Sequence, residues 1–153
     1  MRLVIALYAM GLLIFPAWGL VSPEAYRAEL VEDFHQAEAA ALPQLQLAAG
    51  LHWLKNAYLA FTVLMLARYL GPTGQPGNLQ RAGLLFTVFP VILLVFQVLS
   101  QIALSPDADD LDLRIRLSSE WLLYAIVGLS LLGIARTLPA KAPTSAPAEE
   151  PTP

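Results

Sequence analysis

The chain has 153 residues, of which 57% are apolar and only 14% are charged, and its formal net charge is −3 at pH 7. Soluble domains carry about 25% charged residues, so this composition is typical of a polytopic membrane protein with one membrane domain. The absence of cysteine excludes thiol catalysis, disulfide exchange, iron–sulfur clusters and cysteine-based zinc sites. The negative net charge and the lack of any Lys/Arg run exclude a nucleic-acid partner.

The N-terminal stretch 3–21 is apolar and follows a single charge, Arg2. As a signal peptide it would have a basic start, an apolar core, Pro16 as a helix breaker and a small-residue cleavage site at 17–19. As an uncleaved helix it is about the minimum length that spans a bilayer. We favour the uncleaved helix because later segments also span and the chain need not be released. Whether residues 1–19 are removed stays open.

The segment 22–47 is polar enough to leave the membrane. A hydroxyl residue, a proline and an acid at 22–24 are typical of a helix start. Apolar side chains then recur every four residues opposite acidic ones, which indicates an amphipathic helix. The residues of this stripe are Tyr26, Leu30 and Phe34. We predict a helix over 23–42 that Pro43 ends, with the stripe facing the membrane or the bundle.

Three further segments are long and apolar enough to be spans, at about 50–70, 82–104 and 120–137. The segment 82–104 has no charge and measures about 30 Å as a helix, the thickness of the hydrocarbon core. Pro90 lies near its middle and should kink it. A short turn rich in Gly and Pro at 71–78 predicts that the second and third spans are antiparallel neighbours.

Together with 3–21, these segments predict an all-α membrane domain of four transmembrane helices over 1–138, with the amphipathic helix of 22–47 in the periplasm. Beyond it, prolines recur every four residues among Ala, Ser, Thr and Glu, which predicts a disordered tail over 139–153. The Lys/Arg bias between the two sides is feeble. Ten acidic residues fall outside if the N-terminus is inside, and the signal-like start agrees. We therefore expect a multi-pass protein of a bacterial inner membrane with both termini in the cytoplasm (N-in, C-in).

The segment 111–117 is equivocal, because apolar and charged residues alternate along it with the period of a strand. A strand needs a partner for its backbone groups, and the chain offers no second strand pattern. We therefore expect the last helix to begin between Asp109 and Ser118, and 111–117 not to join a sheet within the monomer. Pairing with another chain is the alternative if the segment is extended.

Five polar residues of the predicted spans are candidates for a polar site or a partner site: His52, Lys55, Asn56, Gln97 and Gln101. The first three lie in the first two turns of their span, on one face, where they could bind an anion, a proton or a head group. The nearby interface favours a simpler interpretation, in which Lys55 snorkels to the surface and His52 lies at head-group level. The two glutamines, with Ser100, favour hydrogen bonds between helices over a water-filled path.

Two other constellations could hold a cofactor or a metal. His35 and His52 are the only histidines and could be axial haem ligands, but b-type cytochromes place these ligands inside spanning helices, and His35 lies outside them. The aspartates of 107–112 lack the order of an EF-hand loop, so we expect a solvated acidic loop. No nucleophile–base pair, phosphate-binding glycine loop or metalloprotease motif occurs. We expect no cofactor, no metal and no catalytic residue.

From these observations we expect a small non-catalytic membrane protein that acts by protein–protein contact, as an accessory subunit, a regulator or an immunity-type partner. Its expected partners are the lipid bilayer and a protein in the membrane or the periplasm. A small transporter or an oligomeric channel component is the alternative, because polar residues and Pro90 lie within predicted spans. A membrane enzyme or haem carrier is a further alternative. The identity of the partner or substrate and the oligomeric state stay open.

Overall fold

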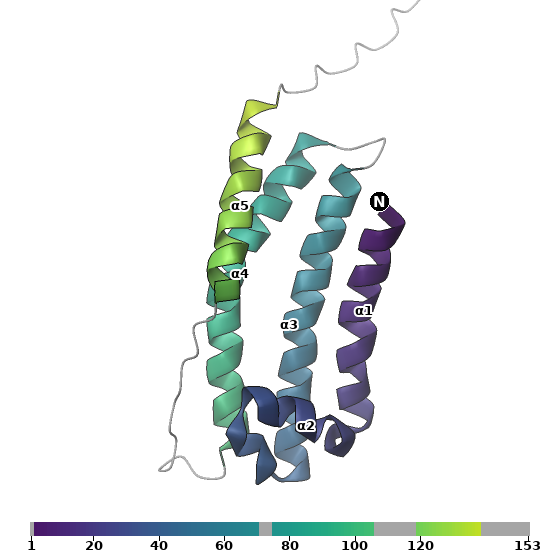
Figure 1. Cartoon of the computed structure of the whole chain (residues 1–153), viewed down its shortest axis with the longest axis vertical. Helices are drawn as coiled ribbons and strands as arrows, with labels where there is room; N and C mark the ends of the chain where they lie inside the picture. Colours follow the sequence, from purple (N-terminus) through teal and green to yellow (C-terminus); the bar gives the residue numbers. More distant parts are fainter. Residues whose placement is uncertain (1, 71–74, 106–118, 139–153) are drawn as a thin grey trace, which may run out of the picture.

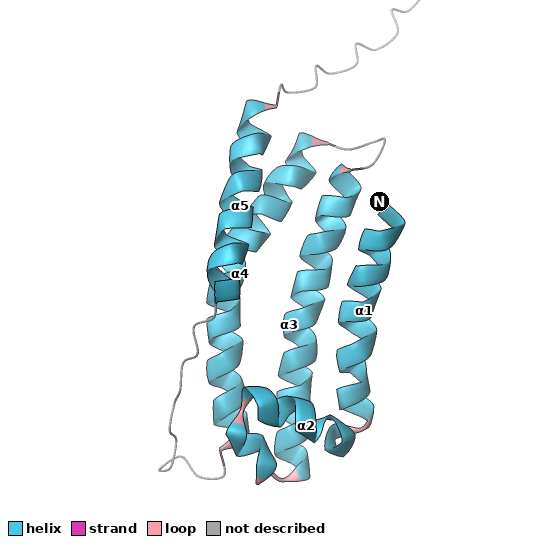
Figure 2. Ribbon diagram, in the orientation of Figure 1, coloured by secondary structure: helices cyan, strands magenta, loops and turns pink. Residues whose placement is uncertain are grey.

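The computed structural model describes residues 2–70, 75–105 and 119–138. These residues form helices and no strand, which confirms the all-α class for this part of the chain (Figure 2). In chain order the elements are α1 (Arg2–Val21), α2 (Pro23–Asp33), the 3-10 helix η1 (His35–Glu38), α3 (Leu42–Tyr69), α4 (Pro76–Leu104) and α5 (Ser119–Thr137).

The four long helices run alternately up and down, and each packs on the next: α1 on α3, α3 on α4, and α4 on α5 (Figure 1). The short helix α2 lies across one end of this layer and packs on α3 and α1. We call this the capped end. The N-terminus and the last turn of α5 both lie at the opposite, uncapped end (Figure 1).

Among the described residues, three helices are long and apolar enough to cross a membrane: Leu3–Val21 in α1, Pro76–Leu104 in α4 and Ser119–Thr137 in α5. The fourth long helix, α3, is more polar because it carries His52, Lys55 and Asn56, and it is not among these three. The helices therefore support a membrane protein, while a crossing by α3 belongs to the proposal below.

The segment between α1 and α3 is a folded cap, which we define as α2 and η1. The stripe of Tyr26 and Leu30 is buried against α3 and the end of α4, and Phe34 is half-buried beside it, so the prediction that the stripe faces the bundle is confirmed. The predicted continuous helix over 23–42 is wrong beyond Asp33, because Phe34 is extended (φ −137°, ψ 104°) and ends α2 there.

Pro43 begins a helix instead of ending one. It lies in the first turn of α3, where a proline's fixed φ suits the helix and its missing N–H is not needed. The side-chain oxygen of Gln44 accepts a hydrogen bond of 2.7 Å from the backbone N–H of Ala41 and closes that turn. As a result, α3 begins at Leu42, well before the expected position near 50.

In Figure 1 α4 is bent, and it contains Pro90, the residue that predicts a kink.

The expectations for 111–117, for a helix start between Asp109 and Ser118, and for the tail 139–153 concern residues outside the described ranges. Within those ranges α5 begins at Ser119.

Candidate functional site

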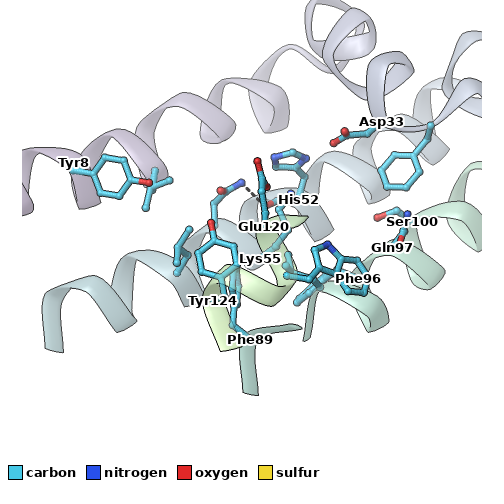
Figure 3. Close-up of a pocket in the computed structure, with 16 residues that line it drawn as sticks. Tyr8, Asp33, His52, Lys55, Phe89, Phe96, Gln97, Ser100, Glu120 and Tyr124 are labelled. Carbon is cyan, nitrogen blue, oxygen red and sulfur yellow. Dashed lines mark hydrogen bonds between the residues drawn. The ribbon is translucent and has the colours of Figure 1, made fainter. Parts of the chain in front are cut away.

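A pocket of about 520 Å³ lies between α1 and α5, and Figure 3 shows the side chains that line it. Its back wall is made by α3 and α4, and the end of α2 closes it toward the capped end. Its polar lining residues are Asp33, His52, Lys55, Asn56, Gln97, Ser100 and Glu120. In Figure 3, His52, Lys55 and Glu120 lie near its middle, with Tyr8 on one side and Asp33 and Gln97 on the other.

The fold brings four of the five candidate residues to this pocket. His52, Lys55 and Asn56 share a face of α3, and Gln97 faces them from α4. The fifth, Gln101, is buried one turn further along α4 and is not part of the lining. Its side-chain nitrogen donates to the backbone oxygen of Gln97 at 3.5 Å, a bond within α4.

Lys55 lies deeper than its predicted place in the first two turns of a helix. Because α3 begins at Leu42, Lys55 is about 20 Å from the helix start, close to mid-length. Gly50 lies at the level of Leu20, near the end of α1, since a Cβ added at Gly50 would be 3.8 Å from the Leu20 side chain. Lys55 is five residues, or about 8 Å, further toward the uncapped end.

Two carboxylates share the pocket with this lysine, and sequence reasoning missed both. Asp33 ends α2 and Glu120 lies in the first turn of α5, and both act electrostatically on Lys55. Neither forms an ion pair with Lys55, because the only pair within 4.0 Å in the described part of the chain joins Arg27 to Glu24. One cation and two carboxylates are therefore held apart around a cavity. In the sequence, the only indication of these two residues is an acidic side chain at the end of α2 and another at the start of α5.

Comparison with protein-family models, with curated proteins and with solved structures finds no match to this chain.

Aromatic rings form much of the remaining wall. Phe89 and Tyr124 line the pocket and meet edge to face with ring centroids 4.8 Å apart. Tyr58 is not part of the lining, but its ring stacks on that of Phe89 at 5.5 Å. The hydroxyl of Tyr58 donates to the backbone oxygen of Leu85 at 2.9 Å, which fixes that ring. Because rings from three helices interlock here, α3, α4 and α5 hold one another in place at the base of the pocket.

Few hydrogen bonds link the polar lining residues of the pocket to one another in the described part of the chain. Asn56 donates to the backbone oxygen of His52 at 2.9 Å, the dashed line of Figure 3, and no hydrogen bond joins two of the lining side chains. The side-chain oxygen of Gln97 is buried and accepts no hydrogen bond from the residues that the structure describes. These polar groups can therefore bind a polar ligand.

The two histidines do not meet. His35 is exposed in η1, whereas His52 is half-buried beneath Tyr26, whose ring meets it edge to face at 5.8 Å. No group of three or more His, Cys, Asp or Glu in the described ranges could hold a metal ion.

A second, narrower hollow of about 380 Å³ continues the pocket along α1. The two hollows share Tyr8, Leu12, His52 and Asn56. The rest of its lining is mainly apolar where it follows α1, at Gly11, Phe15 and Pro16. A polar chamber and an apolar groove are therefore joined.

Proposed function

We propose that this protein is a four-span membrane protein, with both termini in the cytoplasm of a bacterium, that acts without catalysis by contact with a second protein at its capped end. The observation that carries the proposal is the folded cap. Antiparallel neighbouring helices such as α1 and α3 are commonly joined by about 2–8 residues. Here the connection is residues 22–41, and it contains α2 and η1. A connection that is this long and folded is expected to have a function besides joining the two helices.

Arg27 holds the cap together. Its guanidinium donates to the backbone oxygens of Ala37, Glu38 and Ala40 at 2.8, 2.9 and 3.0 Å, and to both carboxylate oxygens of Glu24 at 2.9 Å. These bonds tie α2 to η1 and to Ala40, just after it. Because the guanidinium of Arg27 donates to several acceptors at once, these bonds hold the cap in one defined conformation.

The exposed face of the cap is acidic. Its exposed carboxylates, apart from the paired Glu24, are Glu29, Glu32, Asp33 and Glu38. The only cation of the cap, Arg27, is engaged internally. A surface of this kind favours a partner with a basic face, since complementary charge guides encounter and selects the partner.

Packing supports the fourth crossing. α3 lies between α1 and α4, both of which are apolar enough to span, and at 28 residues it measures about 42 Å. Its polar residues His52, Lys55 and Asn56 face the pocket, where spanning helices usually keep such groups.

Site-specific photocrosslinking in native membranes tests the contact. A photoreactive residue at Glu32 should give one discrete adduct, whereas the same residue at the exposed Arg68, near the uncapped end of α3, should give none. Reversing the charges of Glu29 and Glu38 to lysine should reduce the adduct at position 32. Arg27→Met keeps all four exposed acids but releases η1, and should also reduce it. Equal labelling at positions 32 and 68 would show that the capped end has no dedicated partner.

A further inference from the structure

The pocket between α1 and α5 has opposite charges on separate walls. Lys55 comes from α3, whereas Glu120 comes from α5 and Asp33 from the cap, and no direct ion pair joins them in the described ranges. Lys55 is half-buried, whereas Asp33 and Glu120 are exposed. A half-buried charge is stabilised when an opposite charge approaches it. A ligand with one anionic and one cationic group would match both walls at once.

The wall around Glu120 suits the cationic end of such a ligand. Trp121 and Tyr124 follow Glu120 on α5 and also line the pocket, with Phe96 facing them from α4. Aromatic faces attract ammonium groups, most strongly where water is excluded. Gln97 adds a buried side-chain oxygen that receives no hydrogen bond within the described ranges. An ammonium group would therefore meet carboxylates, rings and an unsatisfied acceptor.

The groove that joins the pocket could accommodate an apolar part of the ligand. It runs from the pocket along α1, past Leu12 and Phe15, on a helix whose exposed surface is apolar over Leu3–Val21. Small-molecule sites usually measure about 300–1,000 Å³, and the polar chamber of about 520 Å³ alone falls in this range. An amphiphile could place its head group in the chamber and the start of its chain in the groove.

We propose that this pocket binds an amphiphile whose head group carries a phosphate and a primary ammonium group, with the phosphate beside Lys55 and the ammonium between Glu120 and Asp33. The site shares Asp33 with the acidic face of the cap, and the groove also contacts Glu29, whereas Lys55 and Glu120 lie outside the cap. Lipid binding at Lys55 and Glu120 can therefore fail or hold whether or not a protein partner binds the cap.

Lipid titration of the purified full-length protein, followed by native mass spectrometry in a nonionic detergent, tests this. The probes are dioleoyl phosphatidylethanolamine, which carries both groups, and dioleoyl phosphatidylglycerol, which carries the phosphate without the ammonium. A charge-assisted hydrogen bond contributes about 1.5–3 kcal/mol, so the wild type should bind the ethanolamine lipid at least about tenfold more tightly.

The two walls should separate in the variants. Glu120→Gln should reduce the affinity for the ethanolamine lipid by about tenfold and leave the affinity for the glycerol lipid unchanged. Lys55→Gln should reduce the affinity for both lipids by about tenfold. Lys55→Arg should keep phosphate binding, and this shows that loss in Lys55→Gln is not misfolding. The controls are Arg68→Gln and Glu32→Gln, which remove exposed charges outside the pocket.

Equal affinity of the wild type for the two lipids, or pocket variants that match the controls, would overturn the proposal. A soluble competitor distinguishes a membrane lipid from a free solute with the same head group. Glycerophosphoethanolamine in a hundredfold excess should leave the lipid bound, because it cannot fill the apolar groove. Displacement at equimolar concentration would show that the occupant is not an amphiphile.

Discussion

At the scale of single residues, Tyr26 is the centre of the cap. Its side chain is only 4% exposed, and a Cβ added at Gly19 would lie 2.7 Å from its ring. Its ring edge contacts His52, yet its hydroxyl is buried with no hydrogen-bond partner in the described part of the chain. The ring therefore stabilises the cap by packing, and nothing in the described residues explains the hydroxyl.

Burial raises the pKa of Tyr26 from 10.0 to about 12, with a further contribution from the carboxylates of Glu29 and Asp33. Between pH 10 and 12 the unfolded chain loses this proton while the folded protein keeps it. The free energy of unfolding should therefore fall as pH rises, by about 2–3 kcal/mol once pH passes 12. Chemical unfolding in detergent at pH 9 to 12 measures this fall.

Tyr26→Phe is the matched variant, because it keeps the ring and removes the group that titrates. At pH 7 it should unfold with the same free energy as the wild type or about 1 kcal/mol more, since a buried unsatisfied hydroxyl is removed. Above pH 10 it should lose less stability than the wild type. A parallel fall in both proteins would assign the alkaline loss to other groups.

At the scale of helices, α4 and α5 cross at two glycines. A Cβ at Gly83 would lie 2.9 Å from the backbone nitrogen of Leu132 and 3.0 Å from the backbone oxygen of Gly128. A Cβ at Gly128 would in turn collide with Thr87 and would lie 2.8 Å from the oxygen of Gly83. Small residues let helix backbones approach in this way in membranes. Of the small residues of α5, Gly128 makes the close contact, whereas Ser130 is exposed.

Gly128→Ala should therefore separate α5 from α4 and destabilise the protein by about 1–3 kcal/mol, the usual range for overpacking. Gly133→Ala is the control on the same helix, because nothing lies within 4 Å of a Cβ added there. Thermal unfolding of the two variants in one detergent gives the comparison. Equal stability would mean that the two backbones are not in close contact at Gly128.

At the scale of the whole molecule, the four long helices alternate in direction. The cap therefore lies at one end, and the start of α1 and the last turn of α5 lie at the other (Figure 1). The apolar surface of this layer is large: exposed side chains include Leu3, Phe15 and Trp18 of α1 and Leu122 and Leu129 of α5. Such a surface is stable only in an apolar solvent, so three apolar helices and their exposed side chains point to the bilayer.

Cysteine labelling should show that α3 also crosses. The chain has no cysteine of its own, so single substitutions at the exposed Glu32, Arg81 and Thr137 carry the only thiols. A membrane-impermeant maleimide should label Glu32→Cys in intact cells, and Arg81→Cys and Thr137→Cys only after the membrane is opened. Labelling of positions 32 and 81 from one side would mean that α3 does not span.

The sequence alone determined which segments form the long helices, though not where α3 begins, and which face of α2 is buried. Apolar runs without charges, such as 82–104, form helices because a backbone in an apolar medium must satisfy its hydrogen bonds locally. The spacing of Tyr26 and Leu30 likewise gave the buried face of α2, because a helical period depends on neighbours in the chain.

Only the tertiary structure decided the limits of the cap and the composition of the site. A proline is compatible with the end or the start of a helix, so the sequence does not decide the role of Pro43. In the fold Pro43 lies in the first turn of α3, and Arg27 holds the preceding residues in the cap through bonds to the backbone oxygens of Ala37 and Ala40. Asp33 and Glu120 lie far from Lys55 in the chain and meet it because α2, α3 and α5 pack around one pocket. Periodicity records contacts within an element, whereas these contacts join separate elements, and no local pattern specifies them.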